Sequence, residues 1–384
     1  MLHSIKLFII CAYAICTIPA VAQKEQSIPL KNYLALSWKE VANRMPAAWY
    51  GSKEAKAVAE NVLIAQKEIG GWAKNIPYHH LLSEAEKSEY IRDKSKAGAT
   101  FDNESTTTEL RFLAKVYEQL HDPRYRQAFD RGVDYILKAQ YKNGGWPQYF
   151  PVKDSADEVL LDHTVPYSMH ITFNDDAMVN IMQFLDNIFS DNEAFASLQI
   201  SRQVKASAKK AYDKGIECFL KTQIIVHNKP SIWCAQHHEI TLVPANARAY
   251  ELASFSGSES IGIILLLMEI DHPSREVIAS VNGAITWLEE HKMEGIKITT
   301  ETDSDGRKNR VVAKDKNAPA LWARFYDLQT EKPFFCSRDG VKKDALSEIS
   351  YERRNGYSWY TTRPAEAIKK YPEWVKKWNV NTEH

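Results

Sequence analysis

The sequence predicts an all-α protein, an incomplete (α/α) toroid in which helix pairs repeat around a ring. A Gly-Gly-Trp motif that recurs along the chain, a second motif that precedes helical patterns, and the scarcity of strand patterns support this fold. Copies of the first motif lie at 64–72 (IAQKEIGGW), at 138–146 (KAQYKNGGW), more weakly at 220–223 (LKTQ) with Trp233, and at 284–295 with Trp287. Helical units that recur along a chain in this way typically stack side by side into a curved array.

The second motif lies between these copies and begins a helix each time. Its copies are TFDN at 100–103, TFND at 172–175 and SFSG at 254–257. Apolar residues follow each copy at helical spacing. Thr106 with Glu109, and Ser256 with Glu259, are spaced as capping boxes. Residues 261–268 are apolar all round, which is typical of a buried helix.

In such a ring the helices that follow the second motif are expected to run parallel and to start at one mouth. We therefore expect Asp102, Asp175 or Asp176, and the segment near Ser256 to converge there, although they are far apart in the sequence. Capping of the helix is the alternative role for each of these residues, because Asp, Asn and Ser are favoured N-caps.

The domain organisation is expected to be simple. Residues 1–22 read as a signal peptide, because an apolar run is followed by Ala20, Val21 and Ala22 as a cleavage site. That run is too short to cross a membrane, so we expect an exported protein, periplasmic or secreted, without a membrane span. Residues 23–384 then form a single toroid. Three segments stand out from the helical pattern, two expected surface loops and one short strand: 151–168, 301–317 and 296–300.

Composition excludes several classes of protein. The chain has 49 basic and 49 acidic residues, so no excess of positive charge favours nucleic-acid binding. Apolar residues make up 44%, which is typical of a globular protein. Cys218, Cys234 and Cys336 follow the signal peptide, and none lies in a CxxC motif. A disulfide scaffold and a zinc site are therefore not expected.

Oxygen-bearing side chains at the expected mouth suggest two kinds of chemistry. Asp102 and Asn103 start one helix, and Asn174, Asp175 and Asp176 start another. Oxygens from separate helices could hold Ca²⁺, which accepts six to eight hard ligands and takes water for the remainder. Alternatively, two of the carboxylates could be the acid and base of a glycosidase. The residues alone leave both possibilities open.

Six motifs in order resemble the pectate lyases of polysaccharide lyase family 10, over roughly residues 60–345. They are GGWAKN at 70–75, ATFDN at 99–103 with TTT at 106–108, NGGWPQ at 143–148, ITFNDDAM at 171–178, ARAYEL at 247–252 with SGSES at 256–260, and RFY at 324–326 with CSRDG at 336–340. The resemblance implies a toroidal (α/α) fold and Ca²⁺-dependent β-elimination of polygalacturonate. Ala73, and Glu104 with Ser105, depart from the expected pattern.

The resemblance also implies roles for individual residues. Arg248 matches the position of the catalytic base. Asp175 is the leading Ca²⁺ ligand and Asp102 the second, with Asn103 and Asp176 as weaker candidates. The residues expected to bind substrate carboxylates or to support the sugar subsites are Lys74, Arg324, Arg338, Tyr250 and Trp146. Trp72 could act similarly, although core packing is the alternative for both tryptophans.

Two other functions remain alternatives at this stage. One is a toroidal glycoside hydrolase that uses Asp102 and Asp175 as its carboxylate pair. The other is a non-catalytic pectin-binding protein. In each of the three cases the expected partner is a pectate chain, and we expect the protein to be a monomer.

Overall fold

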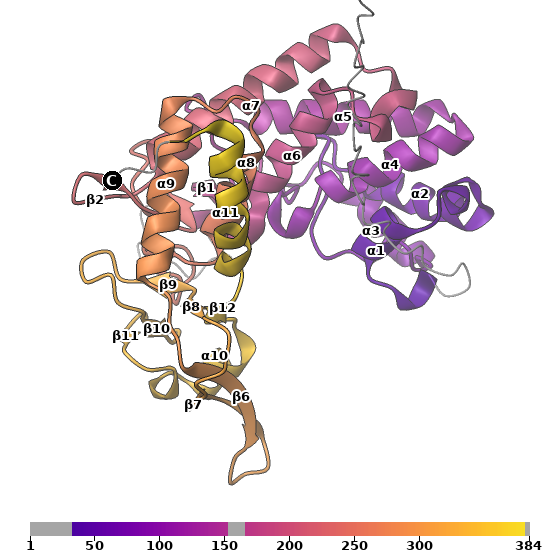
Figure 1. The fold of residues 1–384 in the computed structure, drawn as a ribbon. Helices are drawn as coiled ribbons and strands as arrows, with labels where there is room; N and C mark the ends of the chain where they lie inside the picture. Colours follow the sequence, from indigo (N-terminus) through magenta and orange to yellow (C-terminus); the bar gives the residue numbers. More distant parts are fainter. Residues whose placement is uncertain (1–32, 153–165, 381–384) are drawn as a thin grey trace, which may run out of the picture.

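The computed structural model describes residues 33–152 and 166–380, and confirms the predicted all-α class (Figure 1). Its α-helices are α1 (Trp38–Arg44), α2 (Lys53–Ala65), α3 (Glu84–Arg92), α4 (Thr107–Leu120), α5 (Pro123–Ala139), α6 (Ala177–Phe189), α7 (Arg202–Thr222), α8 (Glu259–Glu269), α9 (Arg275–Glu290), α10 (Tyr351–Gly356) and α11 (Pro364–Trp378). Short 3₁₀ turns are η1 (Tyr33–Ala35), η2 (Ala47–Gly51), η3 (Asp102–Glu104), η5 (Tyr167–Met169), η6 (Asn174–Asp176), η7 (Glu193–Leu198) and η8 (Leu346–Glu348). The predicted signal peptide and most of the 151–168 loop lie outside the described residues.

Strands are short, except for one hairpin. They are β1 (Ile171–Thr172), β2 (Ile225–Val226), β3 (Lys229–Pro230), β4 (Gln236–His237), β5 (Phe255–Ser256), β6 (Ile296–Thr302), β7 (Lys308–Lys314), β8 (Trp322–Ala323), β9 (Phe325–Tyr326), β10 (Phe335–Cys336), β11 (Lys342–Lys343) and β12 (Tyr360–Thr361). They pair antiparallel as β1–β4, β2–β3, β5–β9, β6–β7, β8–β12 and β10–β11. The predicted strand at 296–300 is confirmed. The expectation that 301–317 is a loop is wrong, because β7 pairs with β6 there.

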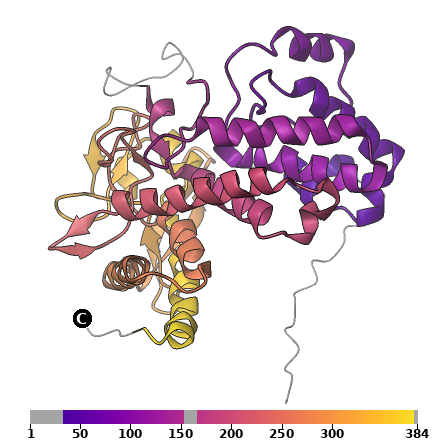
Figure 2. The ribbon, with the colours of Figure 1, turned by 90° about the horizontal axis from the view of Figure 1, so that it is seen from above.

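The helices form two rows, as a toroid requires. Helices α4, α6 and α8 contact one another in sequence, and α2, α5, α7 and α9 form the second row. Each helix of the first row packs on the helix that follows it in the chain. Figure 2 shows the long helices of successive pairs lying side by side. Helix α11 contacts both α8 and α9 and extends the array.

The recurring Trp of the first motif joins each turn to the end of a preceding helix. The indole N–H of Trp72 donates to the carbonyl of Val62, that of Trp146 to Ile136, and that of Trp233 to Phe219, at 2.7–2.8 Å. These carbonyls belong to the last turns of α2, α5 and α7, where backbone carbonyls begin to run out of helical partners. Those of Val62 and Phe219 also accept from the backbone N–H of Gln66 and Gln223. The motif is therefore a helix-terminating device repeated around the ring.

The recurring Gln links neighbouring helices of the second row. Gln66, Gln140 and Gln223 are the residues at the ends of α2, α5 and α7. Each side-chain amide donates to one carbonyl in its own turn and to another in the next helix of the row. The glutamine recurs in the sequence because the same contact forms at three helix ends.

Two details of the expected repeat are wrong. The fourth indole that donates to a helix end is Trp322, which bonds Leu288 at 2.7 Å, and not Trp287. In the third copy of the second motif, Ser256 and not Ser254 is equivalent to Thr100 and Thr172. The backbone N–H of each of these three residues donates to the backbone carbonyl of a motif tryptophan: Trp233, Trp72 and Trp146, respectively. The spacing between successive closing tryptophans is wider after Trp146 than between Trp72 and Trp146. The later motif copies were therefore aligned at the wrong residues.

The glycines of the first motif cannot be replaced by larger residues. Gly70 and Gly144 have φ of 110° and 96°. A Cβ added to either would lie 2.2 Å or less from a carbonyl oxygen of the neighbouring helix, that of Arg131 or Lys214. The turn therefore needs both the left-handed conformation and the small side chain of glycine.

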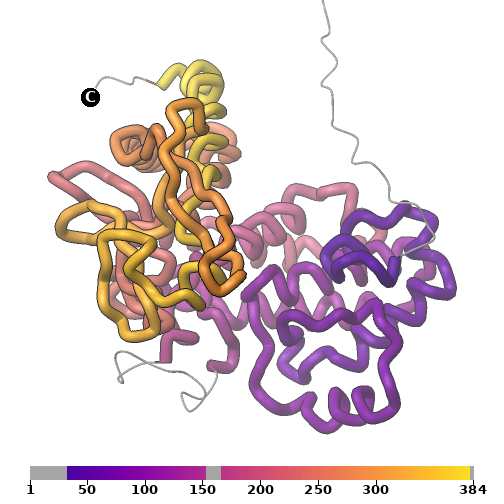
Figure 3. Tube along the Cα trace, turned by 90° about the horizontal axis from the view of Figure 1, so that it is seen from below, coloured from indigo at the N-terminus to yellow at the C-terminus, as the bar shows by residue number. Residues whose placement is uncertain are grey.

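The last part of the chain builds a second apolar cluster beside the helices. Its buried members include Tyr250, Phe325, Phe335 and Trp359. Figure 3 shows this part next to the C-terminal helices and away from the N-terminal ones. All three described cysteines are free and buried. No helix in the described ranges is long and apolar enough to cross a membrane.

Candidate active site

The predicted convergence of helix starts at one mouth is confirmed. Turn η3, which precedes α4, contacts turn η6, which precedes α6, and η6 also contacts α8. Asn103, Asp175 and Asp176 adopt left-handed φ values of 50–58°, which Asn and Asp tolerate better than other residues with a Cβ. The capping box predicted for Thr106 and Glu109 is present at the start of α4.

Asp102 and Lys74 form an ion pair on one side of the mouth. The carboxylate is buried, whereas a third of the lysine side chain is exposed. Burial lowers the pKa of Lys74, but the charge and hydrogen bond of Asp102 outweigh it and the pKa is raised overall. The neighbouring Asn103 donates its amide N–H to Oδ1 of Asn75 at 3.0 Å.

Arg324 connects the carboxylates of the next two repeats. Its guanidinium donates to Oδ1 of Asn174 at 3.1 Å and lies 3.4 Å from Oδ1 of Asp175, and it forms a buried ion pair with Glu259. The side chain of Asp175 is 45% exposed, so its carboxylate remains open to the mouth. Burial lowers the pKa of Arg324, but Glu259 and other anionic neighbours raise it by more.

Asp176 points to the other side of the same turn. Its Oδ2 accepts from Arg363 at 2.7 Å, and its Oδ1 is buried without a hydrogen-bond partner in the described part of the chain. Burial raises the pKa of Asp176, and the nearby Arg363 offsets part of that rise. A Cβ on Gly262 would lie 2.4 Å from Oδ1, so this oxygen faces α8.

Arg248 is held by an ion pair with Glu251. Its Nε donates to Oε2 of Glu251 at 2.8 Å, and Nη2 bonds the other carboxylate oxygen. Tyr357 donates to the same carboxylate at 2.7 Å. Burial lowers the pKa of Arg248, but the hydrogen bonds and charge of Glu251 raise it by more. Sequence reasoning missed Glu251, although it lies three residues beyond Arg248 in the ARAYEL motif.

Three guanidinium groups surround the ring of Tyr250. Those of Arg353, Arg248 and Arg338 lie 4.5, 5.0 and 5.6 Å from its centroid. Arg338 also pairs with Glu352 at 3.0 Å. Sequence reasoning missed Arg353, because it lies beyond the recognised motifs. Tyr250 is only 2% exposed, so the prediction that it supports a sugar directly is wrong, and its ring instead packs against the arginines.

Trp146 is also wrongly predicted to contact substrate. The side chains of Trp146 and Trp72 are fully buried in the main core, and their indole groups close the helix ends described above. Neither ring has a face on which a sugar could stack. The core-packing alternative is therefore correct for both tryptophans.

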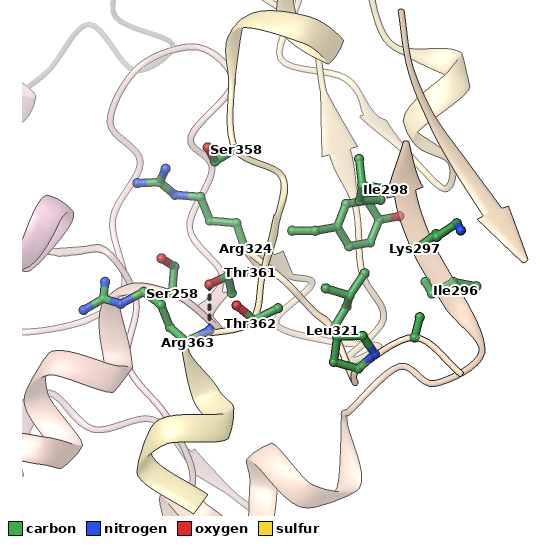
Figure 4. A pocket seen from close by; sticks show the side chains of 13 residues that line it. Ser258, Ile296, Lys297, Ile298, Leu321, Arg324, Ser358, Thr361, Thr362 and Arg363 are labelled. Carbon is green, nitrogen blue, oxygen red and sulfur yellow. Dashed lines mark hydrogen bonds between the residues drawn. The ribbon is translucent and has the colours of Figure 1, made fainter. Parts of the chain in front are cut away.

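One cavity lies beside Arg324 and Arg363. The cavity, of about 640 Å³, is lined in part by Lys297, Arg324 and Arg363. In Figure 4 the side chains of Arg324 and Arg363 extend to the same side, away from Ile298 and Leu321. Both guanidinium groups pair with carboxylates of η6, those of Asp175 and Asp176.

The donor set at the mouth is compatible with a hard cation. Within the described ranges no three His, Cys, Asp or Glu side chains are grouped to hold a metal ion. Ca²⁺ does not require such a group, because it also accepts amide oxygens and water. Asp102 and Asn103 on η3, with the exposed Asp175 on the contacting turn η6, provide carboxylate and amide oxygens of this kind.

Comparisons with known proteins point to one family. The family described as pectic acid lyase matches residues 66–368. A family 10 polysaccharide lyase from Cellvibrio cellulosa is similar, with a TM-score of 0.69 and 30% identity over 92% of this chain and 99% of that one.

An aspartate-to-alanine variant of a family 10 polysaccharide lyase from Cellvibrio cellulosa, in complex with trigalacturonic acid, is equally similar. Its TM-score is 0.69, with 30% identity over 90% of this chain and 99% of that chain. No curated protein matches. Because the family match spans most of the chain and the solved structures agree with it, the protein belongs to the pectic acid lyase family and is a pectate lyase of polysaccharide lyase family 10.

Proposed function

We propose that this pectate lyase cleaves polygalacturonate by Ca²⁺-dependent anti β-elimination, with Arg248 as the base. The observation that carries the proposal is the Asp175–Arg324 contact of 3.4 Å. It joins the turns that bear carboxylates to the part of the chain that bears the arginines. Asp102, Asn103 and Asp175 would provide oxygens for the cation. Asp176 is the weakest candidate, because one of its oxygens is paired with Arg363 and the other faces α8.

The reaction places defined demands on the side chains. The base removes the proton from C5 of a galacturonate, the electron pair forms the C4–C5 double bond, and the C4–O4 bond breaks as O4 leaves. The carboxylate on C5 must be neutralised for charge to develop, and bound Ca²⁺ would supply this as a Lewis acid. Arg324 and Arg338 are suited to bind carboxylates through two parallel N–H groups, and Lys74 through one charge.

The state of Arg248 is the main chemical requirement. In the free protein Glu251 holds its guanidinium charged, whereas a base must be neutral. Arg338 and Arg353 lie on the same tyrosine ring, and like charges disfavour each other's protonated form. We propose that the guanidinium leaves Glu251 when the substrate binds, and that these cations then favour its neutral form.

The product tests this proposal and separates it from the two earlier alternatives. Purified protein would be incubated with polygalacturonate, with added Ca²⁺ or with a chelator. We expect ultraviolet absorbance from the conjugated C4–C5 double bond with Ca²⁺, loss of turnover with chelator, and recovery when Ca²⁺ is restored. A hydrolase would form reducing ends without this absorbance, and a binding protein would form neither. Turnover that survives prolonged chelation would remove the metal from the mechanism.

The export of the protein is a separate proposal. We infer that residues 1–22 are removed during secretion and that the mature enzyme acts as a monomer in the periplasm or the medium. Mass spectrometry of the protein recovered outside the cytoplasm would find a chain that begins at Gln23. Sedimentation would find a single species with the mass of one chain.

A further inference from the structure

Tyr357 contacts residues from two parts of the candidate site. Its hydroxyl donates to Oε1 of Glu251 at 2.7 Å. The guanidinium of Arg324 lies 4.6 Å from its ring centroid, and the ring of Tyr250 lies 5.1 Å away at an interplanar angle of 77°. Tyr357 therefore touches both the carboxylate that holds Arg248 and an arginine that pairs with the turn η6.

The main chain of Tyr357 is held by the β6–β7 hairpin, which was expected to be largely a loop. Strand β7 packs against α10, and Tyr357 directly follows that helix (Figure 1). The guanidinium of Arg310 on β7 donates to the carbonyl of Tyr357 at 2.9 Å. The backbone N–H of Arg310 donates to Oδ1 of Asn355 at 2.7 Å, in the last turn of α10. The hairpin thus fixes the segment that carries Tyr357.

The carboxylate of Glu251 depends on few donors. Its side chain is only 4% exposed. Both oxygens accept from the guanidinium of Arg248, Oε1 also accepts from Tyr357, and Oε2 lies 3.4 Å from the backbone nitrogen of Arg248. Once the guanidinium leaves, Tyr357 is the one side-chain donor that remains to this carboxylate in the described part of the chain. A buried carboxylate without hydrogen bonds is unstable, so the Tyr357 hydroxyl makes the release of Arg248 less costly.

This hydroxyl stays a donor at the alkaline pH at which a neutral arginine forms. Burial raises the pKa of Tyr357 well above its usual value, and the charge of Glu251 raises it further. The other charged or titratable groups that surround Arg248 and Glu251 are Tyr250, Arg324, Arg338 and Arg353. Within the described ranges none of these four donates a hydrogen bond to Glu251.

We propose that Tyr357 is a positioning residue that keeps Glu251 in place and hydrogen-bonded while Arg248 moves to the substrate. The inference rests on the proposed function, because it requires Arg248 to leave Glu251. Tyr357 acts through Glu251 and takes no proton from the substrate. Its ring, beside Arg324, is a separate contact that the hydroxyl does not affect.

The first test is Tyr357→Phe, which removes the hydroxyl and keeps the ring beside Arg324. Glu251 then has fewer donors, so it binds Arg248 more strongly and releases it less readily. On polygalacturonate at saturating Ca²⁺ we expect kcat to fall about tenfold to a hundredfold, as for a lost hydrogen bond to a charged group, with KM changed by less than about threefold. The rising limb of the pH–rate profile should move to higher pH by about one unit or more.

This direction is opposite to the shift expected for Glu251→Gln, and a general loss of structure would not produce it. Circular dichroism would confirm that the variant is folded. An unchanged kcat, a limb that stays in place or moves to lower pH, or a rise in KM as large as the fall in kcat would overturn the proposal.

A double variant tests whether Tyr357 acts through Glu251. In a Glu251→Gln background the charged acceptor is absent, so adding Tyr357→Phe should change kcat by less than about twofold and leave the limb where Glu251→Gln alone places it. Equal losses from Tyr357→Phe in both backgrounds would refute the positioning role.

A matched control is Tyr371→Phe. The hydroxyl of Tyr371 on α11 donates to Oδ1 of Asn282 on α9 at 2.9 Å, and neither residue contacts the arginines around Tyr250. We expect kcat and the pH–rate profile of this variant to match those of the wild type. If the control moves the limb as Tyr357→Phe does, the effect is not local and the proposal fails.

The contribution of the hairpin is tested by Arg310→Met, which removes the donor to the carbonyl of Tyr357. We expect kcat to fall about threefold to tenfold, as for one lost hydrogen bond. Arg307→Met is the control on the same hairpin, because Arg307 is 54% exposed and pairs with Asp303 near the turn. Its kcat should equal that of the wild type. Equal kcat in Arg310→Met and the wild type would contradict the role of the hairpin.

Failure of the proposed function would give a different result. The wild type would then form no unsaturated product, or Arg248→Ala would keep its kcat. With product formed and Arg248→Ala inactive, the variants of Tyr357 test the positioning role alone.

Discussion

At the scale of single residues, the site depends on how each charge is paired. Asp175 is the carboxylate that remains nearly half exposed, whereas Asp102 is buried against Lys74. Arg248 is also 44% exposed but is held on one side by Glu251. A side chain that changes its protonation state or its binding partners during a reaction must be accessible to the substrate. It must also have a neighbouring residue that holds it in position. Asp175 and Arg248 meet these two conditions.

The first prediction concerns the base itself. Arg248→Ala should lower kcat by about 10²–10⁴-fold, the usual contribution of a general base, while substrate binding by the other cations largely persists. Steady-state kinetics on polygalacturonate, with circular dichroism to confirm folding, would measure this. A variant whose kcat stays near the wild-type value would discard the assignment of Arg248.

The second prediction concerns the pH dependence. Glu251 raises the pKa of Arg248, so the neutral form needed for catalysis becomes populated only at high pH, and the rate should rise toward alkaline pH. In Glu251→Gln that influence is lost, the pKa of Arg248 falls, and the rising limb of the pH–rate profile should move to lower pH. Profiles of kcat/KM for both proteins would test this. A Glu251→Gln profile that coincides with that of the wild type, with only a loss of stability, would give Glu251 a purely structural role.

At the scale of elements, the repeat in the sequence predicted the helix pairs because each copy makes the same contacts. A tryptophan that closes a helix and a glutamine that bridges to the next one are local requirements, so they remain visible in the sequence. The carboxylate-bearing turns were predicted for the same reason. The pairing of Glu259 with Arg324 and that of Tyr357 with Glu251 were not predicted, because the partners lie 65 and 106 residues apart. Trp146 was misassigned because a repeated aromatic residue in a motif does not reveal which way its side chain points.

The third prediction concerns these bridging glutamines. Gln223 is buried and donates to the carbonyls of Ser231 and Ser280 at 2.7 and 2.9 Å. Gln223→Ala removes both hydrogen bonds, leaves the carbonyl of Ser231 without its side-chain donor, and should lower the free energy of unfolding by about 1–3 kcal/mol. Urea denaturation would measure the loss, and kcat per folded molecule should not change. Gln127→Ala, at an exposed position on α5, should leave stability within about 0.5 kcal/mol of the wild type.

At the scale of the whole molecule, arginines and aspartates gather in different places, although the chain has no net charge and these arginines are paired with glutamates. Arginines gather around Tyr250, and carboxylates gather on the turns η3 and η6. The toroid makes this possible, because it brings the starts of helices that are about 70 residues apart to one mouth, while the second apolar cluster supports the arginines beside it. Each region then meets a different part of an anionic substrate.

The last prediction follows from this segregation. Because the arginines attract a polyanion in open solvent, salt should weaken binding by screening, over a Debye length of about 10 Å at 0.1 M. At saturating Ca²⁺ we expect KM for polygalacturonate to rise several-fold between low and high salt, with a smaller change in kcat. Arg338→Gln removes an exposed cation of this group and should flatten the dependence of KM on salt. Arg126→Gln removes a cation paired with Asp130 on α5 and should keep the wild-type dependence. If both variants respond to salt alike, attraction of the substrate comes from the whole surface and not from the arginines at the mouth.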